Sequence, residues 1–264
     1  MAVKNDLKIF RPVQVNGLKR LGNRFDGGYI VHGPSLADVE VLINYGVGYN
    51  VKFEKDFFKE TGAPTLAFDP TLKSIRPIAD KLKNGQFIPF LRHLKNYITW
   101  KFQESSLPAF HIKYVEEGLS GNDRGEYKTL LYHYNHYGLH EKKSILKIDI
   151  EGAEYEVFND KSVYPLLSNT LQVIIEFHDL AQHMEELITI MTELSKTHAL
   201  IHIHANNHAN TFSFYETAIP GAIEVTFLSN KYLPNKVPSL SSYPIPGLDS
   251  PCHKLKADIP LNFF

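Results

Sequence analysis

The chain has 264 residues, of which 43% are hydrophobic and 22% are charged. This is the composition of an ordinary globular protein, and the length suits one α/β domain with an ample core, so we expect residues 1–264 to form a single domain. Lysine and arginine number 28 against 29 acidic residues. Because this balance leaves no basic field, we expect no nucleic-acid partner.

The single cysteine, Cys252, excludes an internal disulfide framework and a zinc cluster built from cysteines. The N-terminus is polar and leads to no apolar signal core. No run approaches the roughly 20 apolar residues of a membrane-spanning helix. We therefore expect a reducing, cytoplasmic location and no membrane span.

In chain order, short apolar runs typical of buried strands alternate with stretches of helical spacing. The predicted strands cover residues 39–45, 64–69, 109–115, 144–150, 171–178, 199–204 and 222–228. The predicted helices cover residues 50–61, 72–84, 125–138, 154–167 and 181–197. Such alternation implies an α/β fold with a Rossmann-like, doubly wound, mostly parallel seven-stranded sheet.

Three stretches depart from this alternation. Residues 85–107 are rich in aromatic and basic side chains, and we interpret them as a helical insertion or cap over the sheet. No helix fits between residues 211–215 and the strand 222–228, with Pro220-Gly221 as the turn, so we expect the last strand to be antiparallel. The tail 234–264 is rich in proline and serine and is expected to wrap the surface as extended chain.

Polar side chains gather where three neighbouring predicted strands end. Asp149 ends one strand, Glu176 and His178 end the next, and His204 ends a third. Ligands of open α/β sheets bind at the carboxyl ends of the strands. Because carboxylates and imidazoles are ligands of divalent cations, we predict a metal, Mg²⁺ or Mn²⁺, held by Asp149, Glu176 and His178.

A structural interpretation of the same residues stays open. Glu151 and Glu154 follow Asp149 where a helix begins, and acids there favour the helix dipole without binding any ligand. Histidines at strand ends can be satisfied by backbone groups. Between the two acids after the strand, we assign the metal or substrate to Asp149 rather than to Glu151.

The first two strands predict a nucleotide-type cofactor. Gly46 and Gly48 follow the first strand, and Asp69 ends the second at the position where an acid holds a ribose diol. Taken alone, the glycines could simply end a strand and Asp69 could cap a helix. The full dinucleotide fingerprint is absent because Val51 takes the place of its third glycine, which disfavours nicotinamide. S-adenosylmethionine fits this pattern better.

Several segments carry a more specific resemblance. They are Arg24–Val31, Tyr45–Gly48, Phe53-Glu54, Ala67–Thr71, Leu146–Glu154, Ile175–His178 and Ile203–Asn207. Together they span about residues 20 to 230, and the segment Leu146–Glu154 is the most specific of them. With these segments the chain resembles the FkbM-like branch of S-adenosylmethionine-dependent methyltransferases. The insertion 85–107 and the tail after residue 234 are outside the resemblance.

The resemblance implies a set of cofactor-binding residues at the ends of the first strands and in the N-terminal segment. They are Asp26, Gly27, Gly28, Gly46, Gly48, Asp69 and Asp149. Taken alone, the sequence Asp26-Gly-Gly is also that of a plain turn. The resemblance also implies a sugar or another small-molecule hydroxyl as the methyl acceptor.

Methyl transfer to a sugar hydroxyl needs help because such a hydroxyl barely ionises near neutral pH. A divalent cation at Asp149 would orient a vicinal diol and stabilise the developing alkoxide. His178 or His204 is the predicted general base, since an imidazole titrates near pH ~6.5. Asp149, His178 and His204 are therefore the predicted catalytic residues.

We thus predict an O-methyltransferase that acts on a nucleotide-activated sugar or a polysaccharide precursor, with residues 85–107 stacking the base and holding the diphosphate. One alternative is a lipid, phenolic or peptide acceptor. A second is a noncatalytic domain that binds a partner through its aromatic insertion. Exposed aromatic side chains would also suit a homodimer.

Overall fold

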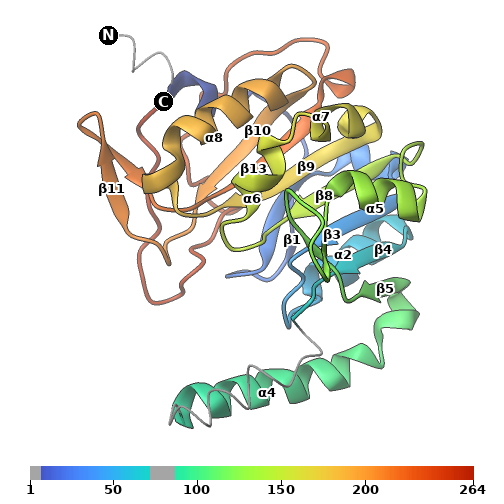
Figure 1. Cartoon of the computed structure of the whole chain (residues 1–264). Helices are drawn as coiled ribbons and strands as arrows, with labels where there is room; N and C mark the ends of the chain where they lie inside the picture. Colours follow the sequence, from blue (N-terminus) through green and yellow to red (C-terminus); the bar gives the residue numbers. More distant parts are fainter. Residues whose placement is uncertain (1–6, 72–86) are drawn as a thin grey trace.

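The computed structural model describes residues 7–71 and 87–264 and is built around one seven-stranded sheet (Figure 1). Its strands are β3 (Val41–Tyr45), β4 (Thr65–Phe68), β5 (Ile112–Val115), β8 (Ser144–Ile148), β9 (Thr170–Phe177), β10 (His198–Ala205) and β13 (Ile223–Ser229). The spatial order is β10-β13-β9-β8-β3-β4-β5. All neighbours are parallel except β13, which is antiparallel to both β9 and β10. The predicted fold class is confirmed.

Helices cover the sheet and two-stranded ribbons surround it. The helices are α2 (Lys52–Thr61), α4 (Phe87–Glu104), α5 (Leu130–Tyr137), α6 (Glu154–Asn159), α7 (Val163–Leu166) and α8 (Leu180–Ser195). Short 3₁₀ turns are η1 (Leu7–Phe10), η2 (Pro34–Asp38), η3 (Leu107–Phe110), η4 (Leu167–Asn169) and η5 (Asn230–Tyr232). The ribbons pair β1 (Leu18–Gly22) with β2 (Gly28–His32), β6 (Gly118–Leu119) with β7 (Tyr127–Lys128), and β11 (Thr211–Phe214) with β12 (Thr217–Pro220).

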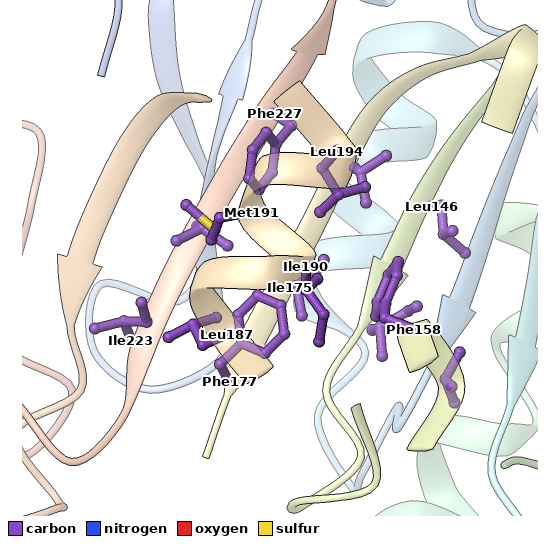
Figure 2. Close-up of a cluster of buried hydrophobic side chains, with 14 of the residues drawn as sticks. Leu146, Phe158, Ile175, Phe177, Leu187, Ile190, Met191, Leu194, Ile223 and Phe227 are labelled. Atoms are coloured by element: carbon purple, nitrogen blue, oxygen red, sulfur yellow. The ribbon is translucent and has the colours of Figure 1, made fainter. Parts of the chain in front are cut away.

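The main core lies between α8 and one face of the sheet (Figure 2). Apolar residues at spacings of three and four give α8 its buried face. These residues are Met184, Leu187, Ile190, Met191 and Leu194. Opposite them lie Ile175 and Phe177 of β9 and Ile223 and Phe227 of β13. Because each such buried side chain contributes about 1.5–3 kcal/mol, this layer holds β9 and β13 firmly in place.

The opposite face of the sheet is covered by α2 and by the β1-β2 ribbon. Phe53 and Phe57 of α2 and Tyr29 and Val31 of β2 pack in one buried cluster with Ile174 of β9. The sequence did not predict this ribbon, whose second strand is wholly buried. Its position brings the N-terminal segment against the centre of the sheet.

Two predicted helices are shorter than expected. The predicted helix 154–167 stops at Asp160, which is extended and accepts the backbone N–H of Ser162 at 2.9 Å, so α6 and α7 are separate. The predicted helix 125–138 begins only at Leu130, because the Thr129 side chain caps it by accepting the N–H of Tyr132. Both changes come from short polar side chains that favour helix ends over helix interiors. The predicted helix 72–84 falls outside the described residues.

The last strand is antiparallel as predicted, but its partner is not the segment 211–215. β11 pairs instead with β12 in a separate ribbon, and Pro220, expected in a turn, lies in β12. β13 is buried along its whole length between β9 and β10. The buried backbone N–H and C=O groups on both edges of β13 need strand partners, which β9 and β10 supply.

The described part of the stretch 85–107 is a helical insertion, as expected, but it does not cap the sheet. Figure 1 shows α4 running outward beyond β5, away from the sheet faces. Its C-terminal end is anchored by Trp100, which is fully buried and packs with Leu107 and Ile112. Ile98 and Phe102 are 47% and 77% exposed. Within the described ranges, no helix has the length and apolarity needed to cross a membrane.

Candidate active site

A cavity of about 490 Å³ lies where β3, β4 and β8 end. This is the switch point of the sheet, since the chain moves outward from β3 to β5 and then returns to β8 on the other side. The cavity wall contains six of the seven predicted cofactor residues: Asp26, Gly27, Gly46, Gly48, Asp69 and Asp149. Gly28, the seventh, lies in β2 behind the wall.

The glycine loop after β3 is fixed by sterics and by Asp69. Gly46 has a φ of +74°, and a Cβ there would lie 1.6 Å from the carbonyl oxygen of Asp149. No other residue therefore fits between β3 and β8. Gly48 has a φ of +61°, and its N–H donates to Oδ2 of Asp69 at 3.0 Å. The loop and the acid after β4 thus form one preorganised unit.

Asp69 has capacity left for a ligand. Its Oδ1 accepts the N–H and the hydroxyl of Thr71 at 2.8 and 2.7 Å, and its Oδ2 accepts from Gly48. A carboxylate offers about four lone-pair sites, so these bonds do not exhaust it. Burial, together with the charge of Asp69, raises the pKa of the neighbouring Tyr49, which also lines the cavity.

Asp149 forms the inner wall of the cavity. The Tyr29 hydroxyl donates to its Oδ2 at 2.7 Å, and Nζ of Lys147 lies 3.8 Å from the same oxygen. Tyr29 also donates to Oε2 of Glu176 at 3.4 Å. Burial and the two carboxylates hold the pKa of Tyr29 well above its ordinary value, so the hydroxyl stays protonated and serves as a donor.

Glu154 organises the loop after β8, a role that the sequence analysis missed. Its Oε1 accepts the backbone N–H groups of Ile150 and Gly152 at 3.1 and 3.3 Å and contacts Nδ1 of His178 at 3.0 Å. This closed loop holds Glu151 at a φ of +56°, which is unusual for a residue with a side chain. An acid two residues after a glycine, where the loop turns into α6, was the available signal.

His178 is surrounded by carboxylates. Its Nε2 lies 3.5 Å from Glu176, 3.7 Å from Glu151 and 3.8 Å from Asp149. Burial alone would lower the pKa of His178, but the bond to Glu154 and the nearby carboxylates raise it to about 9. In this structure the imidazole is therefore protonated at neutral pH, and it is a general base only when that proton is removed.

Asp149, Glu151 and His178 each offer one donor atom, and these atoms lie within 4.8 Å of one another. We call these three residues the cavity cluster. The predicted set had Glu176 in place of Glu151. Glu176 is 3% exposed, and its carboxylate is already engaged by the Asn206 amide and the Tyr29 hydroxyl. Glu151, which is 88% exposed at its side chain, is free to turn toward a ligand.

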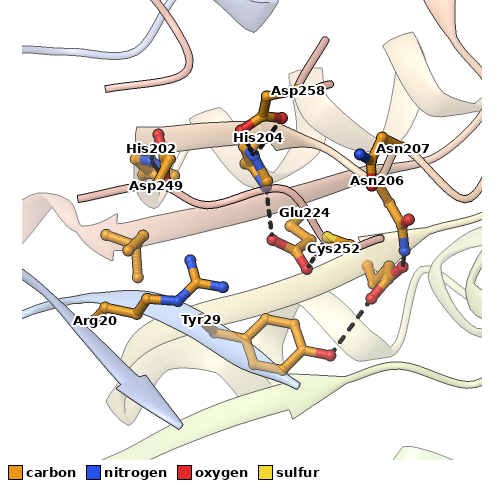
Figure 3. A network of polar contacts seen from close by, with 12 residues as sticks. Arg20, Tyr29, His202, His204, Asn206, Asn207, Glu224, Asp249, Cys252 and Asp258 are labelled. Atoms are coloured by element: carbon orange, nitrogen blue, oxygen red, sulfur yellow. Dashed lines mark hydrogen bonds and ion pairs between the residues drawn. The ribbon is translucent and has the colours of Figure 1, made fainter. Parts of the chain in front are cut away.

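His204 is not brought into the cavity. Figure 3 shows its contacts with Glu224 and Asp258. Its Nδ1 lies 3.1 Å from Glu224 and its Nε2 lies 3.0 Å from Asp258. Burial opposes protonation, but contacts with Asp258, Cys252 and Glu224 raise its pKa to about 12. We call these four residues the tail cluster. Because both ring nitrogens are occupied, the structure speaks against the predicted role of His204 as a base.

Carboxyl groups outnumber cations around the inner wall. Glu54, Asp149, Glu154 and Glu176 meet the cations of Lys147 and His178. Burial raises the pKa of Glu54 to about 7, and burial with Asp149 raises that of Glu176 well above its ordinary value. Burial is the first cause of both shifts, and a positive charge placed beside these carboxyl groups would offset it, so the site favours a cationic ligand.

Solved structures with a related backbone are distant. A fibrillarin from Methanococcus jannaschii shares 7% identity at a TM-score of 0.39, covering 74% of this chain and 68% of its own. M. jannaschii TYW2 in complex with AdoMet shares 11% at 0.33, covering 82% and 88%. A precorrin-6Y C5,15-methyltransferase domain from Rhodobacter capsulatus shares 14% at 0.33, covering 74% and 84%. These likenesses are too weak to bear on function.

Similarity at the level of sequence families is more direct. No curated protein matches the chain. The family model of the Methyltransferase FkbM domain matches residues 44–218, which is more than half of the chain and includes the glycine loop, Asp69 and the cavity cluster. The chain therefore belongs to the FkbM family and is an S-adenosylmethionine-dependent methyltransferase.

Proposed function

We propose that the enzyme transfers the methyl group of S-adenosylmethionine to a hydroxyl of a sugar, carried by a sugar nucleotide or a polysaccharide precursor, with a divalent cation bound at the cavity cluster. The observation that carries this proposal is the cavity cluster itself. Its carboxylates and imidazole converge beside the cavity wall that holds the glycine loop and Asp69.

The proposed cofactor position follows from the hydrogen-bonding capacity of the wall. Oδ2 of Asp69 has one lone-pair site left to accept a ribose hydroxyl, while the open space around Gly48 lets a nucleoside approach the backbone. The methyl-bearing sulfonium would then lie toward Asp149, on the side of the cavity that is short of positive charge. Asp26 and Gly27 would close the same pocket from the N-terminal segment.

The donor set fits a divalent cation. Asp149 and Glu151 supply carboxylate oxygens and His178 supplies Nε2, a mixture that suits Mg²⁺ or Mn²⁺ with water completing the shell. Glu154 accepts from Nδ1 of His178, which is the outer-shell bond that orients a metal-binding imidazole. When bound, the cation supplies Lewis-acid activation of a hydroxyl.

The side chains of the enzyme itself position the acceptor and move its proton. Asp149 can accept a hydroxyl proton at the cavity wall while Tyr29 steadies its other face through Oδ2. His178 can accept a proton at Nε2 once it is neutral. Since the pKa of His178 is about 9, turnover that uses it as a base without a cation rises with pH up to that range.

The proposed acceptor is a sugar hydroxyl. A diol or hydroxyl suits a wall of carboxylates, which favours a sugar over a lipid. Arg124 and Tyr127 of the β6-β7 ribbon line the cavity and offer a cation and a ring to a nucleotide-bound sugar. The described side chains of α4 do not line the cavity. We therefore assign the base-stacking role to this ribbon instead of to residues 85–107.

Transfer of a labelled methyl group tests the proposal directly. The enzyme would be incubated with labelled S-adenosylmethionine and panels of sugar nucleotides, phenols and peptides, with and without chelator. We expect labelled sugar products that diminish on chelation and return with Mg²⁺ or Mn²⁺. Labelling of phenols or peptides alone would contradict the proposed sugar acceptor. Full activity in the presence of chelator would contradict the proposed role of the cation.

A further inference from the structure

We propose that Glu54 and Lys147 form a subsite for the amino-acid end of the cofactor, with Glu54 binding its ammonium and Lys147 binding its carboxylate. The inference rests on the proposed cofactor position and adds a pair of residues to it. Both side chains line the cavity, Glu54 from α2 and Lys147 from β8.

Glu54 has an oxygen without a partner. The side chain is 2% exposed, and its Oε1 accepts a hydrogen bond from the amide of Asn44. Its Oε2 is buried and has no hydrogen-bond partner among the described residues. Burying an unpaired carboxylate oxygen is costly, so a protein retains one where a ligand completes it. A cationic group in the cavity is the chemistry that completes Glu54.

Lys147 is a buried cation on the same wall. It is 4% exposed, and its Nζ lies 4.4 Å from the centre of the Tyr29 ring and 3.8 Å from Asp149, beyond hydrogen-bond length. Lys147 and Glu54 are not within ion-pair distance of each other in the described structure, where the nearest acid to Nζ is Asp149. Two opposite charges therefore face one cavity without forming an ion pair, although burial raises the pKa of Glu54 and the charge of Lys147 acts through space against that rise.

A zwitterion matches this arrangement. The amino-acid end of S-adenosylmethionine carries one ammonium and one carboxylate, and Glu54 and Lys147 offer one charge of each opposite sign. Asp69, where we place the ribose, accepts the N–H of Gly48 in the glycine loop. The cofactor would thus extend from Asp69 past Gly46 to Glu54, with its sulfonium between the two ends.

Calorimetry with whole and truncated ligands tests the subsite. S-adenosylhomocysteine carries the amino-acid end and 5′-methylthioadenosine lacks it. We expect Glu54→Gln to weaken S-adenosylhomocysteine binding by about tenfold to 100-fold and to leave 5′-methylthioadenosine binding within about twofold. Gln keeps an oxygen for Asn44, so the fold is preserved. Glu60→Gln, on the same helix at an exposed position, is the matched control and should change neither.

Ligand truncation in the wild-type enzyme provides a second test that does not depend on the variant folding. Deaminated and decarboxylated analogues of S-adenosylhomocysteine should each bind about tenfold or more weakly than the parent. Lys147→Met should remove the penalty for the missing carboxylate while keeping the penalty for the missing ammonium. That selectivity distinguishes a direct contact from a general loss of structure.

The outcomes separate this inference from the function on which it rests. Equal binding of whole and truncated ligands by the wild-type enzyme would overturn the subsite and leave the cofactor site standing. Equal losses for both ligands in Glu54→Gln would overturn it as well. Failure of the wild-type enzyme to bind either ligand would overturn the proposed cofactor position together with the subsite.

Discussion

The cavity cluster and the tail cluster are built from the same residue types at the ends of neighbouring strands, and they differ in how the histidine is paired. In the tail cluster, both nitrogens of His204 lie 3.0–3.1 Å from carboxylates. In the cavity cluster, only Nδ1 of His178 is bonded, and its Nε2 stands 3.5–3.8 Å from three carboxylates. Both ring nitrogens of His204 are therefore paired, whereas Nε2 of His178 is still available to a ligand or a proton.

This difference teaches how to separate a structural histidine from a functional one. A histidine whose two nitrogens are both bonded to acids has a structural role. Here His204 fixes the tail through its contact with Asp258. A histidine with one bonded nitrogen is oriented and still reactive. Mutations in the cavity cluster should therefore lower catalytic activity, whereas mutations in the tail cluster should lower the free energy of unfolding.

The largest expected effect is on catalysis. Asp149→Asn should lower kcat/KM by about 10²–10⁴-fold, because it removes the charge at the cavity wall that faces the acceptor. The amide is nearly isosteric and still accepts from Tyr29, so the thermal unfolding midpoint should stay close to that of the wild type. Steady-state kinetics and a melting curve check this, and Glu185→Gln at an exposed position of α8 is the control.

Mutation of the tail cluster should lower the stability of the protein rather than its activity. His204→Ala leaves Glu224 and Asp258 without their cation and should lower the free energy of unfolding by about 3–5 kcal/mol. The kcat per folded molecule should change little. Denaturant unfolding beside active-site titration measures both quantities, and a loss of kcat with unchanged stability would make His204 catalytic after all.

The pH dependence of stability sharpens the same contrast. Because the folded-state pKa of His204 is raised to about 12, its contribution is fully present below the unfolded value near ~6.5 and is lost as the pH rises above it. The wild type should lose up to about 1.4 kcal/mol per pH unit from this group. Unfolding at pH 7 to 9 should show a shallower slope in His204→Ala.

Cation binding is a smaller test of the cavity cluster. Glu151→Gln should weaken Mn²⁺ binding by about tenfold, since it removes one carboxylate from the donor set while its exposed side chain leaves the fold alone. Electron paramagnetic resonance of added Mn²⁺ gives the affinity without any turnover. A matching loss in Glu216→Gln, in the β11-β12 ribbon, would mean that only general surface charge is measured.

The smallest expected effect is in α4. Phe102→Ala removes an exposed ring that is remote from the cavity lining and should change stability by less than about 0.5 kcal/mol and leave kcat/KM unaltered. Kinetics with the best acceptor check this. A clear loss of activity would restore the original interpretation of residues 85–107 as part of the acceptor site.

Much of the site could be predicted because parallel strands end at one edge. Gly46, Asp69 and Asp149 follow β3, β4 and β8 directly, so the order of apolar runs is enough to place them together. The same argument placed His204 there, but the cavity lining does not include it, because the argument ignored the tail. A tail acid more than fifty positions away occupies that histidine, and no local pattern indicates such a contact.

The sequence by itself determined the α/β alternation, the antiparallel last strand and the residues that follow each strand, because periodicity and strand direction are local properties. Only the tertiary structure decided which acids are bonded and which are available. Glu176 is occupied by Asn206 and Tyr29, whereas Glu54 lines the cavity with one buried oxygen that has no partner among the described residues. Pairing depends on contacts between distant segments, and those contacts exist only once the chain has packed.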